Sequence, residues 1–285
     1  MLEMLINPKK AERRPWEMFF VGLFYASLSV LLVSWIFGKD AVLSQYSGIL
    51  IVTFTVMFSI PFVFYTIRLE EKKISPGTGA FSLIKEHKKA LYTFLWLFFG
   101  FVIGFSIFYI VLDSPNNFKA QVETYCLINR PDKLADCTEQ YGINSSVVST
   151  GFATSFEKFR VIFFNNFLVM FFTLIFSLIF GAGVIFILAW NASVIAAAIV
   201  IFTKSSLFQL PIGLARYILH GIPEIAAYFL VAIAGGLVSV AVIRHEFNTE
   251  KFWEVLHDSI NLIVLAIAVL LIAAILEVFV TPLLF

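Results

Sequence analysis

Long apolar stretches alternate with short polar ones along this chain, and the alternation predicts its helices. Six windows carry no charged residue: 18–38, 41–67, 90–112, 161–203, 225–243 and 259–276. A helix needs about 20 apolar residues to cross the hydrocarbon core of a bilayer. We therefore predict an all-α integral membrane protein, a bundle of about seven transmembrane helices.

The window 161–203 decides the number of spans, because it is too long for one straight crossing and barely long enough for two. We expect a full span at 166–189, a turn near Trp190 and Asn191, and a short helix at 192–203. If the short helix crosses, there are seven spans and the C-terminus lies outside. If it re-enters, there are six plus a re-entrant helix, and both termini are cytoplasmic.

Composition supports this class and excludes others. Hydrophobic residues make up 60% of the chain and charged residues 14%, against roughly 25% charged in soluble domains. The net charge of +1 gives no overall field that would attract nucleic acid. We expect the protein to lie in the lipid bilayer and to bind a protein partner or a second copy of itself.

Basic residues in the short polar segments set the expected orientation, since cytoplasmic loops are enriched in Lys and Arg. They cluster before the first span and again at 68–89, whereas Lys39 alone lies between the first two spans. The N-terminus and the 68–89 loop are therefore predicted to be cytoplasmic, which places residues 113–164 outside. We divide the chain into 1–89, two spans with the basic loop, and 90–285, a membrane core that includes the exterior loop.

The exterior loop contains the chain's two cysteines, Cys126 and Cys137. Disulfides form outside the reducing cytosol, so we predict that this pair is bonded and stiffens the loop. In the third span, Gly100 and Gly104 form a GxxxG pattern, which favours a close helix–helix contact.

Polar side chains in and beside the longest apolar stretch are the candidate functional site. Amides, an imidazole and a carboxylate are costly in lipid unless they pair or reach water. We expect them to converge as one polar cluster, for binding or for packing: Asn165, Asn166, Asn191, His220, Gly221 and Glu224.

The His220–Glu224 segment has two interpretations. Because Pro223 disfavours helix at the residue before it, a new helix is expected to begin at Pro223, with Glu224 in its first turn. His220 would then be a solvated neighbour near the membrane surface. The other interpretation places His220 and Glu224 inside the bundle, where they meet the asparagines. Glu277, near the end of the last apolar run, is expected to reach the interface as a snorkelling carboxylate.

No motif predicts catalysis or a cofactor. His220 and Glu224 make only half of a zinc ligand set, and the sequence has neither an H-E-x-x-H nor a Walker motif. We expect a protein that is not an enzyme, with no cofactor and at most a weak metal site at His220 and Glu224.

The second half of the chain resembles the stage II sporulation protein M family of polytopic membrane proteins, over about residues 90–281. The resemblance rests on Asn165-Asn166 opening a span, on Asn191, and on His220-Gly221-Ile222-Pro223-Glu224. It implies a helical membrane core in which these residues belong together. The family's namesake is a scaffold for peptidoglycan-degrading partners during sporulation. This chain adds two N-terminal spans and a basic loop, so sporulation itself and those partners are not carried over.

Two functions follow as hypotheses. The first is a non-enzymatic membrane scaffold or assembly protein, in which the polar cluster fixes the packing of the core. The second is a transporter or channel for a small solute, proton or cation that uses the cluster as its binding site.

Overall fold

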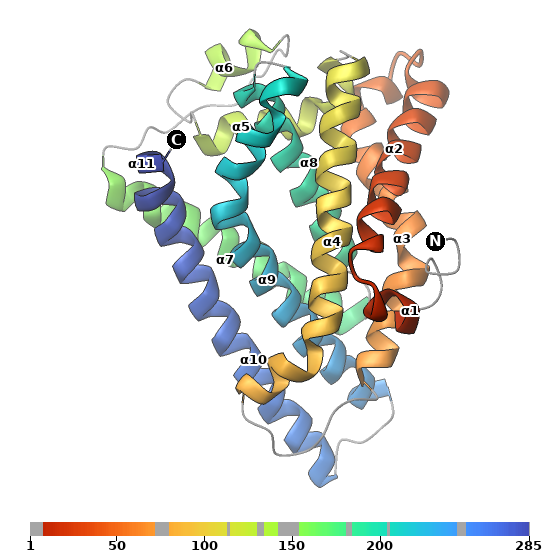
Figure 1. Ribbon diagram of the computed structural model, residues 1–285, viewed down its shortest axis with the longest axis vertical. Coiled ribbons are helices and arrows are strands. Elements are labelled where there is room, and N and C mark those ends of the chain that lie inside the picture. Colours follow the sequence, from red (N-terminus) through yellow and green to blue (C-terminus); the bar gives the residue numbers. More distant parts are fainter. Residues whose placement is uncertain are drawn as a thin grey trace.

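The computed structural model describes residues 8–71, 80–112, 115–129, 134–141, 154–180, 184–203, 206–243 and 249–284. Within these ranges, seven helices are long and apolar enough to cross a membrane. They run alternately up and down the bundle in Figure 1. They are α2 (Glu17–Phe37), α3 (Ser47–Glu71), α4 (Ala80–Leu112), α7 (Ser155–Phe180), α8 (Val184–Phe202), α9 (Leu210–Ile243) and α10 (Glu250–Ile275). The prediction of an all-α bundle with seven spans is confirmed.

Shorter elements join these helices or extend them. They are α1 (Pro8–Arg13), η2 (Leu43–Tyr46), η3 (Pro115–Phe118), α5 (Lys119–Asn129), α6 (Leu134–Gln140), η5 (Leu207–Gln209), the π-helical turn η6 (Leu276–Val280) and α11 (Thr281–Leu284). Helices α5 and α6 lie at the same end of the bundle as α11 (Figure 1), and we call this the α5 end.

The division of the longest apolar window differs from the prediction. Helix α8 runs unbroken through Trp190 and Asn191, so the expected turn there is wrong. The side-chain amide of Asn191 donates to the carbonyl of Ile187, one turn back, at 2.7 Å, and this bond satisfies the amide within the helix. The window is divided instead between the end of α7 at Phe180 and the start of α8 at Val184.

The expected helix start at Pro223 is also wrong, because α9 continues through it. Proline removes one backbone donor from a helix, but membrane helices tolerate this where neighbouring helices surround the freed groups. About 72% of the apolar window of α9 is buried, against 22% for α7. Helix α9 is therefore the central helix of the bundle, and it continues through the proline among its neighbours.

Helices α2 and α4 pack along each other through small residues. A Cβ added at Gly100 would overlap the carbonyl oxygen of Phe19 and lie 2.9 Å from the Cα of Gly22. One at Gly104 would lie 2.8 Å from the Cβ of Ala26. The missing side chains let the two backbones approach, as the GxxxG pattern predicts.

The disulfide between Cys126 and Cys137 is present, as predicted, and it joins α5 to α6. Helix α5 is also attached to the membrane helices. The side-chain amide of Gln121 donates to the carbonyl of Gly48 on α3 at 2.9 Å and to the hydroxyl of Ser193 on α8 at 3.2 Å. These bonds fix α5 across the end of the bundle.

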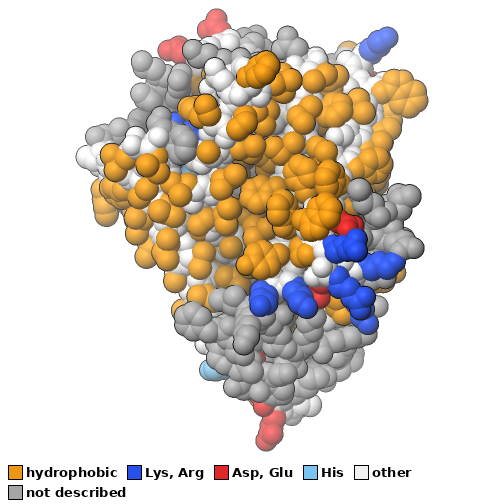
Figure 2. Space-filling view, in the orientation of Figure 1, with side chains coloured by type: hydrophobic (Ala, Val, Ile, Leu, Met, Phe, Trp, Pro, Cys, Tyr) orange, Lys and Arg blue, Asp and Glu red, His pale blue; other side chains and the backbone are white. Residues whose placement is uncertain are grey.

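Basic side chains gather on one side of the apolar surface. Figure 2 shows Lys and Arg side chains below the wide apolar band of this face. Exposed basic residues in the described ranges include Lys9, Arg13, Arg14, Lys88 and Lys89. The structure of residues 72–79, which carry the centre of the predicted basic loop, lies outside the described residues.

Replacing Gly100 by alanine should destabilise the protein, because the new methyl group meets backbone atoms that cannot rotate away. We expect a loss of about 1–3 kcal/mol in the free energy of unfolding. Gly221→Ala is the matched control, since the nearest atom to its new Cβ is Ile195 Cδ1 at 3.9 Å. Thermal unfolding in detergent would measure both, and equal effects of the two variants would contradict the close α2–α4 contact.

Candidate functional site

A polar cavity lies between α7, α8, α9 and η6, beneath α5. It has about 640 Å³ of space not filled by protein, part of it open to the surroundings. This is room for several water molecules, each of which takes about 30 Å³ in the liquid. Its polar lining is Tyr125, Asn165, Asn166, Asn191, Tyr217, His220, Glu224 and Glu277. Such side chains at membrane depth are a functional-site hypothesis by default.

Glu224 is bonded to the helix opposite. The side-chain amide of Asn166, on α7, donates to Glu224 Oε1 at 2.7 Å. Helix α9 carries Glu224, and the continuous helix through Pro223 directs this residue towards α7 in the middle of the bundle. The interpretation that places Glu224 in the first turn of a new helix near the membrane surface therefore does not hold.

Glu277 also lines this cavity. Both carboxyl groups, those of Glu224 and Glu277, line the same cavity and lie close enough to act on each other electrostatically. Glu277 lies on the π-helical turn that follows α10. Such turns are rare, and they occur frequently at functional sites. Glu277 lines the polar cavity between the helices, whereas the sequence suggested a carboxylate at the membrane interface.

His220 is held by the end of the last helix. Its side chain is 8% exposed, and its Nδ1 lies 3.3 Å from the hydroxyl oxygen of Thr281. The Thr281 hydroxyl donates its one hydrogen to the carbonyl of Leu276 at 3.0 Å. Nδ1 is therefore the donor in the His220–Thr281 bond, which leaves Nε2 as the second polar atom of the ring. His220 is not a solvated neighbour of the site.

Two tyrosines connect the cavity to α5. Tyr217, on α9, and Tyr125, on α5, both line the cavity and lie close enough to interact. Tyr125 is the residue before Cys126, so the disulfide braces the helix turn that carries it. The cavity lining at the α5 end thus includes a segment that the disulfide joins to α6.

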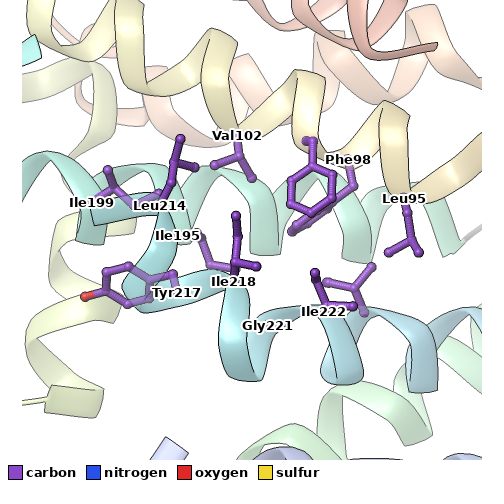
Figure 3. A pocket seen from close by; sticks show the side chains of 12 residues that line it. Leu95, Phe98, Val102, Ile195, Ile199, Leu214, Tyr217, Ile218, Gly221 and Ile222 are labelled. Atoms are coloured by element: carbon purple, nitrogen blue, oxygen red, sulfur yellow. The ribbon is translucent and has the colours of Figure 1, made fainter. Parts of the chain in front are cut away.

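The three remaining predicted residues do not all lie at the polar cavity. Asn165 and Asn191 line the cavity, although the Asn191 amide donates to its own helix. Gly221 does not join the polar cluster. It lines a second, apolar pocket, on the side of α9 that faces α4 (Figure 3). Five of the six predicted residues, all except Gly221, therefore surround one space.

Basic groups lie near the cavity, close enough to act on it electrostatically. Lys158, in the first turn of α7, acts on both Glu277 and His220, and Arg216, on α9, acts on His220. The guanidinium of Arg216 stands over the ring of Phe202, 4.8 Å from its centroid. Among the described residues no group of three or more His, Cys, Asp or Glu side chains is placed to hold a metal ion.

The arrangement can bind either a proton or a cation. A hydrogen bond between two carboxyl groups requires that one of them carries a proton, because a carboxylate only accepts. If neither group carries a proton, the two negative charges in the cavity repel each other. The pair then needs a cation between or beside the oxygens.

Glu277, Tyr125 and Tyr217 are members of the cavity lining that the sequence interpretation missed. The signal for Glu277 was its position inside an apolar run, several residues before Thr281-Pro282, but only the fold shows that it lines the same cavity as Glu224. Tyr125 lies in the predicted exterior loop, and nothing in the sequence indicated that this loop reaches the membrane core.

The comparisons with known proteins give a family and no individual relative. Residues 90–282 match the family described as stage II sporulation protein M. No curated protein and no solved structure matches the chain. The matched region contains every residue of the polar cavity, and it leaves out α1, α2 and α3. It spans well over half of the sequence, so this multi-pass membrane protein belongs to the stage II sporulation protein M family.

Proposed function

We propose that this protein moves protons or a small cation across the membrane, with the Glu224–Glu277 pair as its ion-binding centre. The observation that supports the proposal is that two carboxyl groups from separate elements line one polar cavity. A bundle that needed only tight packing would fill this space with apolar side chains, because buried ionisable groups rarely add stability. The proposed function involves no making or breaking of covalent bonds, and it is therefore not an enzymatic one.

The proposed mechanism is an exchange at one pair of carboxyl groups. With one proton, the pair is held by its own hydrogen bond and by Asn166. When the proton leaves towards the water in the cavity, the two carboxylates take up a cation in its place. The amides of Asn165 and Asn166 and the hydroxyl groups of Tyr125 and Tyr217 offer further oxygen ligands, which suit a hard cation.

The direct test is ion flux in proteoliposomes. Glu224→Gln and Glu277→Gln each keep a hydrogen-bonding group of the same shape but cannot release a proton. We expect at least a tenfold loss of proton or cation flux, measured with a dye inside the vesicles under an imposed potential. Glu254→Gln, which changes an exposed carboxylate on α10, is the matched control and should keep the flux of the unmodified protein.

The scaffold hypothesis predicts a different result for the same variants. A glutamine preserves the hydrogen bond, so a pair that serves packing alone tolerates it without loss. If the unmodified protein gives no flux above empty vesicles, or if both glutamine variants keep full flux, the transport proposal fails. Capture of the same protein partner by the unmodified chain and by both glutamine variants would then favour the scaffold.

Asn166 and Asn165 provide a matched pair for the bond to Glu224. Asn166→Ala removes the donor at 2.7 Å and should lower the free energy of unfolding by about 1–3 kcal/mol. Asn165→Ala, at the exposed neighbouring position, should change it by less than about 0.5 kcal/mol. Thermal unfolding in detergent measures both, and an equal effect of the two changes would show that the Asn166–Glu224 bond is not formed.

We infer the side of the membrane on which the cavity opens from the distribution of Lys and Arg residues. More exposed Lys and Arg residues lie below the apolar band in Figure 2 than at the α5 end, where Lys39 and Arg160 are exposed. Cytoplasmic segments carry this excess, so we propose that the N-terminus is cytoplasmic and that the α5 end, with the disulfide, is outside. The cavity would then open towards the exterior, beneath α5.

Cysteine labelling in intact cells tests this orientation. A cysteine introduced at Ser155, at the α5 end, should react with a membrane-impermeant maleimide from outside. A cysteine introduced at Lys88, at the foot of α4, should react only after the cells are permeabilised. The reverse pattern would invert the proposed topology.

A further inference from the structure

An apolar groove lies between α4, α8 and α9, separate from the polar cavity. The unfilled space in and beside it is about 340 Å³, part of it open to the surroundings. Figure 3 shows side chains of α4 facing those of α9 across the gap, with Gly221 at its floor. Phe98 and Val102 contribute from α4, and Ile218 and Ile222 from α9. The lining offers almost nothing to a polar ligand.

Gly221 accounts for part of this space. In a helix interior, glycine is less favourable than alanine by about 1 kcal/mol, so its presence needs a reason. Gly213 and Gly235, also on α9, have such a reason, because a Cβ at either would come within 3.0 Å of a neighbouring helix. At Gly221 the one neighbour is Ile195 Cδ1 at 3.9 Å, an ordinary contact distance. No close helix contact requires this glycine. What its missing side chain does is leave the groove open.

The shape of the groove fits a chain rather than a compact molecule. Its lining on α9 extends from Leu214 to Ile225, which is about 16 Å along the helix axis at 1.5 Å per residue. The lining on α4 runs from Leu95 to Val102, about 10 Å. An unbranched hydrocarbon chain that lies along the two helices would fill such a space.

The lipid bilayer around the helices supplies such hydrocarbon chains. All three helices that line the groove are membrane-spanning, and their lining residues lie within the apolar windows. Ile222, at the groove, is 37% exposed, so the space reaches the lipid-facing surface of the bundle. We propose that the groove is a specific binding site for one acyl chain of a bilayer lipid, and that Gly221 is the residue that keeps it open.

This site does not depend on the proposed transport. It borders the polar cavity, because Ile195 and Tyr217 line both spaces. A bound chain would therefore support, from behind, the wall of α8 and α9 that carries Tyr217. Only a measurement of lipid binding tests the lipid site, and the ion-flux results do not bear on it.

The test uses photo-reactive phosphatidylcholine in nanodiscs. One probe carries a diazirine in the middle of an acyl chain and the other carries it in the headgroup. We expect the chain probe to label peptides of α4 and α9 around Val102 and Ile218, at a level several-fold above other lipid-facing peptides. The headgroup probe should not label them. Native mass spectrometry after detergent extraction should show one retained phospholipid.

Three variants on α9 separate groove filling from other effects. Gly221→Leu places a side chain in the groove and should abolish both the labelling and the retained lipid. Gly221→Ala fills part of the groove and should lower both signals, whereas Ala215→Leu adds the larger side chain at an exposed position and should behave as the unmodified protein. Val102→Phe fills the groove from α4, and it provides the test if Gly221→Leu does not fold.

Two results would overturn the proposal. The first is equal labelling and equal lipid retention in the unmodified protein and in the folded groove-filling variants. The second is chain-probe labelling that is spread evenly over the lipid-facing helices.

Discussion

Two carboxyl groups inside a bilayer are the constraint around which the core of this protein is arranged. Each would be expensive alone in hydrocarbon, and each is made tolerable by a partner from another element. Glu224 accepts a hydrogen bond from Asn166 and lines the same cavity as Glu277, so α7, α9 and the π-helical turn after α10 meet at one site. His220 adds a second tie, to Thr281. The helices cannot be displaced far without breaking a polar contact that has no substitute in lipid.

Much of the fold could be predicted from the sequence, because the bilayer restricts the possibilities. Runs of apolar residues indicated seven spans, and two cysteines in a polar segment indicated the disulfide; both predictions are confirmed. The errors concern Asn191 and Pro223, both of which were expected to interrupt a helix. Each lies inside one instead, because Asn191 bonds to its own backbone and because α9 is enclosed by other helices. Local propensity was overridden by tertiary surroundings at both positions.

The candidate site could be predicted only in part. Polar residues in apolar sequence pointed to Asn166, His220 and Glu224, since their cost in lipid is visible without a structure. Glu277 was assigned to the interface, because a carboxylate near the end of a span usually reaches water. Tyr125 belongs to a segment outside the apolar windows, and its place at the cavity follows from the bonds that hold α5 across the bundle. What these residues do remains a prediction. Gly221 shows the opposite limit: the family resemblance grouped it with the polar residues, whereas the structure places it in an apolar groove.

The central claim is that Glu224 and Glu277 are in direct contact within the bundle, and a double-mutant cycle tests it most directly. The free energy of unfolding is measured for the unmodified protein, for Glu224→Ala, for Glu277→Ala and for the double variant. Residues in contact couple by about 0.5–3 kcal/mol, and we expect a coupling in that range, with the double variant differing from the sum of the single changes. Additivity within about 0.3–0.5 kcal/mol would mean that the two carboxyl groups do not meet, and would contradict the ion-binding centre built on them.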